Sequence, residues 1–302
     1  MRTEAPQAVA LPNGTHADGE DNAVEANSLR FSFPGSEPVI KDFTLKLPKG
    51  SRCLLAGANG SGKTTVLQVL AGQYMVPEDD IRILGRTPFS DLQLSCTGKL
   101  TFMGSTWRRN VGSAGFDLPL QGDISAETMI FGVENVDPVR REMLLKLLDI
   151  DLSWKMHSVS DGQRRRVQIC LGLLKPFQVL LLDEITVDMD VIGRLDLLEF
   201  LKQECETRGA TIVYATHIFD GIEPWLTHVA YMEDGQLQKS GKIDAVMSQE
   251  ERGKKLLYVV EEWLRKWRNA KRAEGKKEKS ERTQKPIAST PYFPSRHMAF
   301  FR

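Results

Sequence analysis

The residues with the clearest chemical potential are nine consecutive positions, 57–65, that read GANGSGKTT. Their spacing fits the phosphate-binding pattern G-x-x-x-x-G-K-[ST], with an additional glycine at Gly60. Glycines let a backbone wrap closely around an anion, because no Cβ atom intervenes. The N–H groups that begin a helix favour negative charge, so this segment predicts a site for the phosphates of a nucleotide.

The polar residues of this loop have separate expected tasks. Lys63 would reach the outer phosphates, and the Thr64 hydroxyl would bind Mg²⁺. A chance glycine-rich turn is the alternative, but the apolar run 53–56 predicts a buried strand before the loop, and 64–71 predicts a helix after it that Gly72 ends. The loop positions expected to bind nucleotide are Gly57, Asn59, Gly60, Ser61, Gly62, Lys63, Thr64 and Thr65.

Three further candidate side chains follow predicted buried strands. Asp183 and Glu184 follow the apolar run 179–182, and His217 follows the run 211–215. Helices are predicted at 139–148, 164–174 and 191–208. Strands that alternate with helices indicate a doubly wound parallel sheet, whose ligand site lies at the carboxyl ends of its strands. The sequence therefore predicts that the phosphate loop, the acid pair and His217 share one edge of a sheet.

Shorter strands surround this core. Residues 29–33 and 39–47 alternate apolar and polar side chains, which predicts a small antiparallel β subdomain that leads into the phosphate loop. Short strands are also expected at 81–85 and 99–103, and a hairpin at 229–240 turns at Asp234 and Gly235. Residues 104–123 are rich in glycine, serine and proline and predict a long loop.

The two ends of the chain differ from its centre in composition. Residues 1–26 are expected to be a disordered tail, 27–248 a folded domain, 249–273 an amphipathic helix, and 274–302 a basic and polar flexible tail with an aromatic end. Segment 271–285 carries excess basic residues, for which a solvated linker is preferred, although a patch for nucleic acid or an anionic membrane stays open.

Composition excludes several classes of protein. The 302 residues are 41% hydrophobic and 26% charged, as in an ordinary globular protein. A net charge of zero disfavours bulk nucleic-acid binding. Apolar runs are too short to span a membrane. The four cysteines, Cys53, Cys96, Cys170 and Cys205, lack metal or redox spacing and are interpreted as buried, reduced thiols. These features indicate a cytoplasmic protein.

Taken together, the motifs over residues 28–245 resemble the nucleotide-binding domain of ABC ATPases. The phosphate loop and the acid pair look like the two Walker motifs, and 159–163 (VSDGQ) stands where that family has its LSGGQ signature. Segment 187–190 (VDMD) stands at the SALD loop, His217 at the switch histidine, and Phe33 at the aromatic residue that stacks on adenine. The resemblance implies an α/β fold, with a P-loop NTPase core of mostly parallel sheet, an N-terminal antiparallel β subdomain and an α-helical signature subdomain.

A narrower resemblance and several departures accompany this match. The runs 156–163, 173–176, 183–188 and 214–221 are similar to soluble plant proteins of the ABC transporter I family, near members nineteen to twenty-one, and to their fungal relatives. Within the signature, Val159 and Asp161 replace leucine and the first glycine. The glutamine of the family's Q-loop is missing, since Ser105 or Thr106 occupies its approximate place. This loss argues against ordinary coupling to a membrane subunit.

The resemblance also implies a division of tasks for ATP and Mg²⁺. Thr64 and Asp183 would hold the metal, Glu184 would be the general base, and His217 would contact the γ-phosphate. With Lys63, the last two form the expected catalytic set. Each candidate also has a purely structural alternative. Asp183 and Glu184 could be an acid pair in the loop at a strand end, His217 a buried histidine with its hydrogen bonds satisfied, and Phe33 an aromatic residue of the core.

The family's signature acts across an interface between two nucleotide-binding domains. Ser160, Gly162 and Gln163 would therefore complete the site of a second chain, unless Ser160 and Gly162 are a plain helix cap. Because the chain has one phosphate loop, the resemblance implies a head-to-tail dimer, with an identical chain or another ABC ATPase chain.

Three functions follow from these expectations. The favoured one is an ATP hydrolase that drives or gates an unidentified protein partner and is regulatory rather than a transporter component. The second is the ATP-binding subunit of a transporter with separate membrane chains. The third is a nucleotide-gated scaffold with little hydrolysis, if Asp161 slows turnover.

Overall fold

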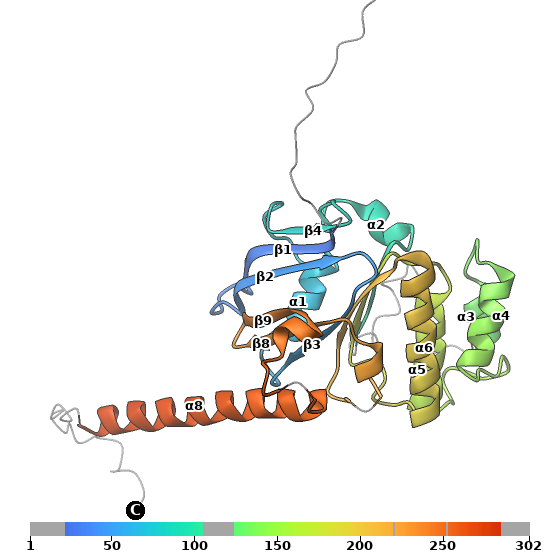
Figure 1. Cartoon of the computed structure of the whole chain (residues 1–302). Coiled ribbons are helices and arrows are strands. Elements are labelled where there is room, and N and C mark those ends of the chain that lie inside the picture. Colours follow the sequence, from blue (N-terminus) through green and yellow to red (C-terminus); the bar gives the residue numbers. More distant parts are fainter. Residues whose placement is uncertain (1–21, 105–123, 220, 252, 285–302) are drawn as a thin grey trace, which may run out of the picture. The chain divides into compact units, whose positions relative to one another are not determined.

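The computed structural model describes residues 22–104, 124–219, 221–251 and 253–284 (Figure 1). The chain forms two compact units, residues 1–253 and 254–302, which are described separately. The loop expected at 104–123, with its Q-loop positions Ser105 and Thr106, lies outside the described residues beyond Gly104.

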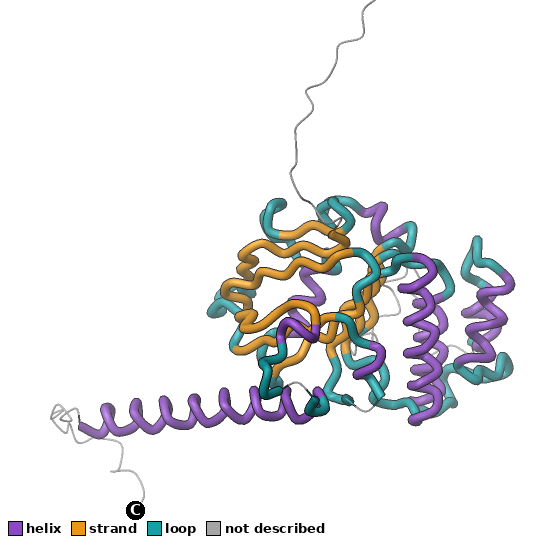
Figure 2. Tube along the Cα trace, in the orientation of Figure 1, coloured by secondary structure: helices purple, strands orange, loops and turns teal. Residues whose placement is uncertain are grey.

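Within the described residues of the first unit, a nine-stranded mixed sheet forms the frame (Figure 2). Its strands are β1 (Asn22–Phe31), β2 (Ile40–Pro48), β3 (Arg52–Gly57), β4 (Ile81–Ile83), β5 (Leu100–Met103), β6 (Val179–Asp183), β7 (Thr211–Ala215), β8 (His228–Glu233) and β9 (Gln236–Lys242). Their spatial order is β4-β1-β2-β9-β8-β3-β7-β6-β5. Strands β8, β3, β7, β6 and β5 are parallel, whereas β4, β1 and β2 pair antiparallel. The predicted α/β fold class, with its N-terminal antiparallel part, is confirmed.

Several helices begin or end at local signals of the sequence. The helices among the described residues of the first unit are α1 (Lys63–Leu70), α2 (Leu92–Cys96), α3 (Ala126–Phe131), α4 (Pro138–Leu147), α5 (Asp161–Leu173), α6 (Val191–Arg208), the 3₁₀ helix η3 (Glu223–Trp225) and α7 (Ile243–Val246). Helix α6 has the expected bounds, because the Asp190 side chain caps its first turn and Gly209 ends it in the left-handed conformation (φ 67°). Helices α3 and α4 pack against α5 and α6 (Figure 1).

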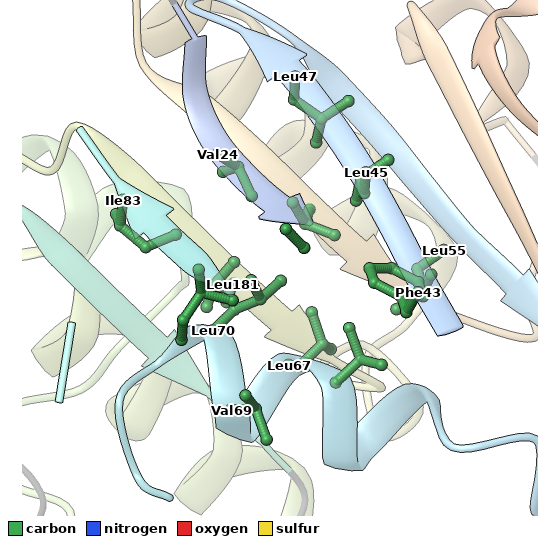
Figure 3. Close-up of a cluster of buried hydrophobic side chains, with 14 of the residues drawn as sticks. Val24, Phe43, Leu45, Leu47, Leu55, Leu67, Val69, Leu70, Ile83 and Leu181 are labelled. Atoms are coloured by element: carbon green, nitrogen blue, oxygen red, sulfur yellow. The ribbon is translucent and has the colours of Figure 1, made fainter. Parts of the chain in front are cut away.

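The hydrophobic core places the phosphate loop by anchoring the helix that follows it. Figure 3 shows side chains of α1 beside side chains of the sheet, including Leu67, Leu70, Phe43, Leu55 and Leu181. Both leucines of α1 are fully buried. Complete burial of one leucine contributes about 1.5–3 kcal/mol, so this face of α1 is held firmly on the sheet. The N-terminus of α1 therefore has a fixed position next to β3.

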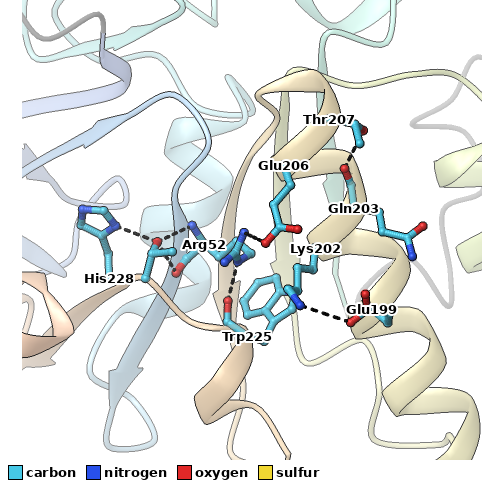
Figure 4. A network of polar contacts seen from close by, with 9 residues as sticks. Arg52, Glu199, Lys202, Gln203, Glu206, Thr207, Trp225 and His228 are labelled. Atoms are coloured by element: carbon cyan, nitrogen blue, oxygen red, sulfur yellow. Dashed lines mark hydrogen bonds and ion pairs between the residues drawn. The ribbon is translucent and has the colours of Figure 1, made fainter.

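A polar network joins neighbouring elements at the edge of the sheet that lies opposite the phosphate loop (Figure 4). Arg52, the first residue of β3, donates from Nε to the carbonyl of Trp225 and lies 3.4 Å from Glu206 of α6. Its backbone N–H donates to the Thr227 hydroxyl at 2.8 Å, and that hydroxyl also contacts Nδ1 of His228 at 2.8 Å. These bonds join β3, β8 and α6 at the amino ends of the strands, away from the edge where the predicted chemistry lies.

The expected N-terminal boundary differs from the structure. Strand β1 begins at Asn22, so residues 22–26 belong to the sheet rather than to a tail that ends at 26. Ala23, Val24 and Ala26 are fully buried and explain the earlier start. Small alanines among polar residues give a weak strand pattern, and pairing with β2 and β4 decides the conformation instead. Residues 1–21 lie outside the described residues.

The described part of the second unit contains one long helix, α8 (Leu256–Gln284). It continues beyond residue 273 into the segment expected to be a flexible tail, because lysine, glutamate, arginine and glutamine are good helix formers. Pairs four residues apart support it, such as Lys266 with Glu262 at 2.9 Å. Residues 285–302, with the aromatic end, lie outside the described residues. Across the described ranges, no helix combines the length and apolar character that crossing a membrane requires.

The cysteines agree only partly with the sequence interpretation. Cys53, Cys170 and Cys205 are buried free thiols, and burial raises the pKa of each to about 12. Such thiols are inert at neutral pH. Cys96 is exposed at the end of the short helix α2, so the expectation of burial was wrong for this one residue.

Candidate active site

The loop between β3 and α1 has the open conformation that its glycines permit. Gly60 and Gly62 have φ angles of 79° and 102°. Gly62 precedes α1 without a side-chain cap, which leaves the start of the helix open to another acceptor. The Ser61 hydroxyl is buried and has no hydrogen-bond partner among the described residues. An uncapped helix start beside an unpaired buried hydroxyl fits an anion such as phosphate.

Lys63 is held by the loop itself. Its Nζ donates hydrogen bonds to the carbonyls of Gly57 at 2.9 Å and Ala58 at 3.0 Å. Burial lowers the pKa of the Lys63 ammonium, and the carboxylates of Glu184 and Asp183 act in the opposite direction. The cation is therefore pre-positioned in the loop and faces both acids.

Thr64 and Asp183 are brought into contact across α1 and β6. The carboxylate of Asp183 is buried, and burial raises its pKa, while a hydrogen bond from the Thr64 hydroxyl partly opposes that shift. Within the described ranges, no group of three or more His, Cys, Asp or Glu side chains could hold a metal. A pair of oxygen ligands instead fits Mg²⁺, which usually keeps several waters and takes further ligands from substrate phosphates.

Glu184 and His217 form a close pair at the carboxyl ends of β6 and β7. Nε2 of His217 lies 2.9 Å from Oε1 of Glu184, and both side chains are partly exposed. Glu184 has a φ of 52°, a left-handed conformation that costs a non-glycine residue about 1–3 kcal/mol. Its backbone N–H donates to the carbonyl of Ala215 at 2.9 Å, which helps to hold that conformation.

A cavity of about 460 Å³ joins these groups. Its lining residues are Val39, Asn59, Gly60, Gly62, Lys63, Thr64, Thr65, Glu184 and His217. The volume lies within the usual range for small-molecule and cofactor sites, roughly 300–1,000 Å³. A second hollow of about 230 Å³ between β2 and β9 contains none of the predicted site residues. The structure thus brings most of the predicted nucleotide site together in one place.

Phe33 does not line this cavity. It lies just beyond β1 and packs edge-on against Phe31 and Tyr74, with ring centroids 5.1 and 5.5 Å away. Val39 lines the cavity instead. The sequence offered no signal for Val39, because it looked like an ordinary first residue of a strand.

The signature residues lie at the start of α5 and do not line the cavity. The Ser160 hydroxyl accepts a hydrogen bond from the Gln163 N–H at 3.2 Å, and the Gln163 side chain accepts one from the Ser160 N–H at 3.0 Å. This reciprocal pair is a capping box. A Cβ at Gly162 would lie 3.0 Å from the carbonyl of Asp188, so the glycine allows a close approach of the 187–190 loop. Asp161 forms an exposed ion pair with Arg164 at 2.8 Å.

Arg165 was also missed by the sequence interpretation. It is the middle of three consecutive arginines in α5, which look like a solvated face. In the structure its side chain is buried and donates to the carbonyls of Ile185 and Gly104. It is therefore connected to the residue directly after Glu184.

Comparison with known proteins agrees with this geometry. The family model described as ABC transporter matches residues 40–187. ABC transporter I family member 21 of Arabidopsis thaliana is 54% identical over 95% of this chain and 99% of its own length. Member 20 of that family in the same plant is 54% identical over 86% of this chain and 81% of its own length. CCR4-associated factor 16 of Saccharomyces cerevisiae is 40% identical over 71% of this chain and 77% of its own length.

Solved structures support the fold. The structure described as the ATP binding subunit of an ABC transporter has a TM-score of 0.64 and 22% identity, and covers 78% of this chain and 98% of that one. The expected resemblance to plant and fungal proteins is confirmed by the sequence relatives. With 54% identity over nearly the full length of both chains, this protein belongs to the ABC transporter family and is related to the plant ABC transporter I family members.

Proposed function

We propose that this chain binds and hydrolyses ATP in a head-to-tail dimer, in order to drive or gate a protein partner. The observation that carries the proposal is the Glu184–His217 pair, 2.9 Å apart, at the rim of the cavity that Lys63 and Thr64 also line. Hydrolysis of a phosphoanhydride requires a cradle for charge, a base and an oriented water. These side chains supply the first two from one edge of the sheet.

Phosphate binding falls to the loop and to Lys63. The N-terminus of α1, the Ser61 hydroxyl and the Lys63 ammonium would surround the phosphate oxygens. Thr64 and Asp183 would hold Mg²⁺, which when bound neutralises charge on the phosphates. Asn59 and Thr65 also line the cavity, and Val39 offers an apolar contact there. Phe33 remains a proposed base-stacking residue. The adenine would have to stack on its ring next to Phe31 and Tyr74, against which Phe33 packs.

The hydrolytic step falls to Glu184 and His217. The Glu184 carboxylate would take a proton from a water whose oxygen attacks the γ-phosphorus, while the bond to the β–γ bridging oxygen breaks. The products are ADP and inorganic phosphate. His217 would fix the carboxylate through its Nε2 contact and meet the γ-phosphate from the same side.

The position of the signature supports the proposed dimer. Ser160, Gly162 and Gln163 line no part of the cavity in their own chain, although their place at a helix N-terminus suits phosphate. In the proposed dimer they complete the site of the second chain, either an identical copy or another ABC ATPase chain. ATP binding would close the two halves, and hydrolysis would release them.

A regulatory role is favoured over transport by two features. The Q-loop glutamine is absent from the sequence at Ser105 and Thr106, and helix α8 adds a segment beyond the first unit. We place the protein in the cytoplasm, since three buried free thiols suit a reducing compartment. The ATP-binding subunit of a transporter is the second candidate. It is supported by 32% identity, over 69% of this chain, to the energy-coupling factor transporter ATP-binding protein EcfA2 of Streptococcus pneumoniae.

The test is the variant Glu184→Gln. We expect phosphate release to fall by about 10²–10⁴-fold, because the general base is lost while its shape is kept. Gel filtration with ATP and Mg²⁺ should show a trapped dimer, and without nucleotide a monomer. The matched control adds Ser160→Arg, which should prevent trapping but leave ATP binding intact. A monomer that binds ATP in the Glu184→Gln protein would sink the dimer mechanism.

A further inference from the structure

We propose that Arg165 is a positioning residue for Glu184, because it donates a hydrogen bond to the backbone carbonyl of Ile185, the next residue in the chain. The inference rests on the proposed function of Glu184 as general base. Arg165 would not touch the nucleotide. It would act by holding the backbone from which Glu184 projects.

The bonding of Arg165 links three segments. Its Nε donates to the carbonyl of Ile185 at 3.0 Å, and its Nη1 donates to the carbonyl of Gly104 at 3.3 Å. Nη1 also lies 3.4 Å from Oε1 of Gln168, one turn further along α5. The side chain is 3% exposed, so these contacts are shielded from water. One planar guanidinium thus joins α5, the end of β6 and the end of β5.

The backbone at Glu184 needs such support. Its φ of 52° is a strained conformation for a residue with a side chain, and it persists only where neighbouring contacts enforce it. Two of the contacts lead to β7: the Glu184 N–H donates to the Ala215 carbonyl at 2.9 Å, and the Thr186 hydroxyl lies 2.7 Å from the Tyr214 hydroxyl. Arg165 provides the contact that leads to α5.

This connection has a consequence for the two halves of the dimer. Ser160, the residue proposed to meet the phosphates bound by the second chain, caps the start of helix α5. Arg165 lies less than two turns further along the same helix and holds Ile185. A shift of α5 when the signature binds the second chain's phosphates would therefore move Arg165 and Ile185. Through Ile185 it would move the adjacent Glu184 carboxylate, which is proposed to activate water in its own chain.

The test compares Arg165→Lys with Arg140→Lys. Lysine keeps the charge but cannot form the planar fork of arginine. Arg140 is a matched control: it is 4% exposed, and its Nε donates to the carbonyl of Leu173, at the far end of α5, at 2.7 Å. We expect Arg165→Lys to lower kcat about 10²-fold, as misplacement of a catalytic group does, with the Kd of ATP within about twofold. Arg140→Lys should change neither.

A second variant guards against misfolding. Gln168→Met leaves the guanidinium in place but removes its side-chain acceptor, so we expect a smaller fall in kcat at unchanged ATP affinity. In a Glu184→Gln background, Arg165→Lys should cause no additional loss, because it acts through the carboxylate already removed.

The possible outcomes separate the inference from the proposed function. If Arg165→Lys multiplies the loss in the Glu184→Gln background, or weakens ATP binding as much as it lowers kcat, the inference is overturned. It is also overturned if Glu184→Gln slows hydrolysis as expected and both Arg165→Lys and Gln168→Met leave kcat unchanged. If Glu184→Gln itself hydrolyses ATP at the original rate, the proposed function fails first.

Discussion

Nε2 of His217 lies 2.9 Å from Oε1 of Glu184, although 32 residues separate the two along the chain. Their strands explain the contact. Strands β6 and β7 are parallel neighbours with Asp183 opposite Ala215, so the residues that follow each strand emerge side by side. The contact orients the Glu184 carboxylate at the rim of the cavity.

Removal of the imidazole should slow hydrolysis without preventing binding. We expect His217→Ala to lower kcat by about 10²-fold, because the carboxylate loses its fixed orientation. The Kd of ATP should change little, since Lys63 and the loop are intact. Phosphate release and titration with a fluorescent ATP analogue measure the two quantities. His157→Ala, at an exposed position of the same protein, is the control and should behave as the original chain. A loss of affinity as large as the loss of rate would show that His217 acts through its γ-phosphate contact rather than by orienting Glu184.

Two glycines of the loop should respond differently to alanine. A Cβ at Gly57 would lie 2.5 Å from the Met232 carbonyl and 2.7 Å from the Ser61 hydroxyl, so the loop must move. A Cβ at Gly60 would meet nothing within 4 Å, and the cost there is the left-handed backbone, about 1–2 kcal/mol. We expect Gly57→Ala to weaken ATP binding at least about 100-fold and Gly60→Ala no more than about 30-fold, as measured by nucleotide titration. Equal effects would refute the steric argument.

Asp183 should lower stability at neutral pH. Burial raises the pKa of the Asp183 carboxyl in the folded state above its value in the unfolded state. The stability that this carboxyl contributes is therefore fully present below its unfolded-state pKa and is lost as the pH rises through its folded-state pKa. Asp183→Asn should therefore raise the melting temperature of the nucleotide-free protein near pH 7. The gain should shrink as the pH falls and the original carboxyl becomes neutral.

The comparison for that prediction is Asp196→Asn, at an exposed position of α6. It should change the free energy of unfolding by no more than about 0.5 kcal/mol. A lower melting temperature for Asp183→Asn at neutral pH would mean that attraction between Asp183 and Lys63 outweighs the cost of burial.

Removing one partner of the Arg140–Glu204 ion pair should lower the stability of the protein strongly, whereas replacing both partners with apolar residues should lower it little. The two groups lie 2.8 Å apart, with side chains 4% and 7% exposed. Loss of Arg140 leaves the buried Glu204 carboxylate with the more exposed Arg208, whose Nε lies 3.5 Å from Oε1. Arg140→Met should therefore lower the free energy of unfolding by about 3 kcal/mol, the lower end of the range for a broken buried pair. Arg140 Nη2 and Glu204 Oε2 have no hydrogen-bond partner among the described residues, so the pair is incompletely satisfied. Arg140→Met with Glu204→Leu should recover most of the loss in urea denaturation. No recovery would show that the pair itself contributes the stability.

Local signals in the sequence predicted many elements closely. The bounds of α6 follow from the Asp190 cap and from Gly209. The hairpin between β8 and β9 follows from Asp234 and Gly235, whose φ angles of 46° and 81° suit a tight two-residue turn. Each of these signals acts within a few residues, so the sequence by itself determined them, together with the phosphate loop and its strand-loop-helix context.

Other features were decided only by the tertiary structure. The left-handed backbone of Glu184, its contact with His217 and the bonds of Arg165 all join segments far apart in the chain. Packing also places Phe33 against Tyr74 and gives Val39 the place at the cavity. Their residue types alone are compatible with a core, a surface or a site. Which of these each residue occupies depends on the neighbours that the folded sheet brings to it, and no local pattern encodes those neighbours.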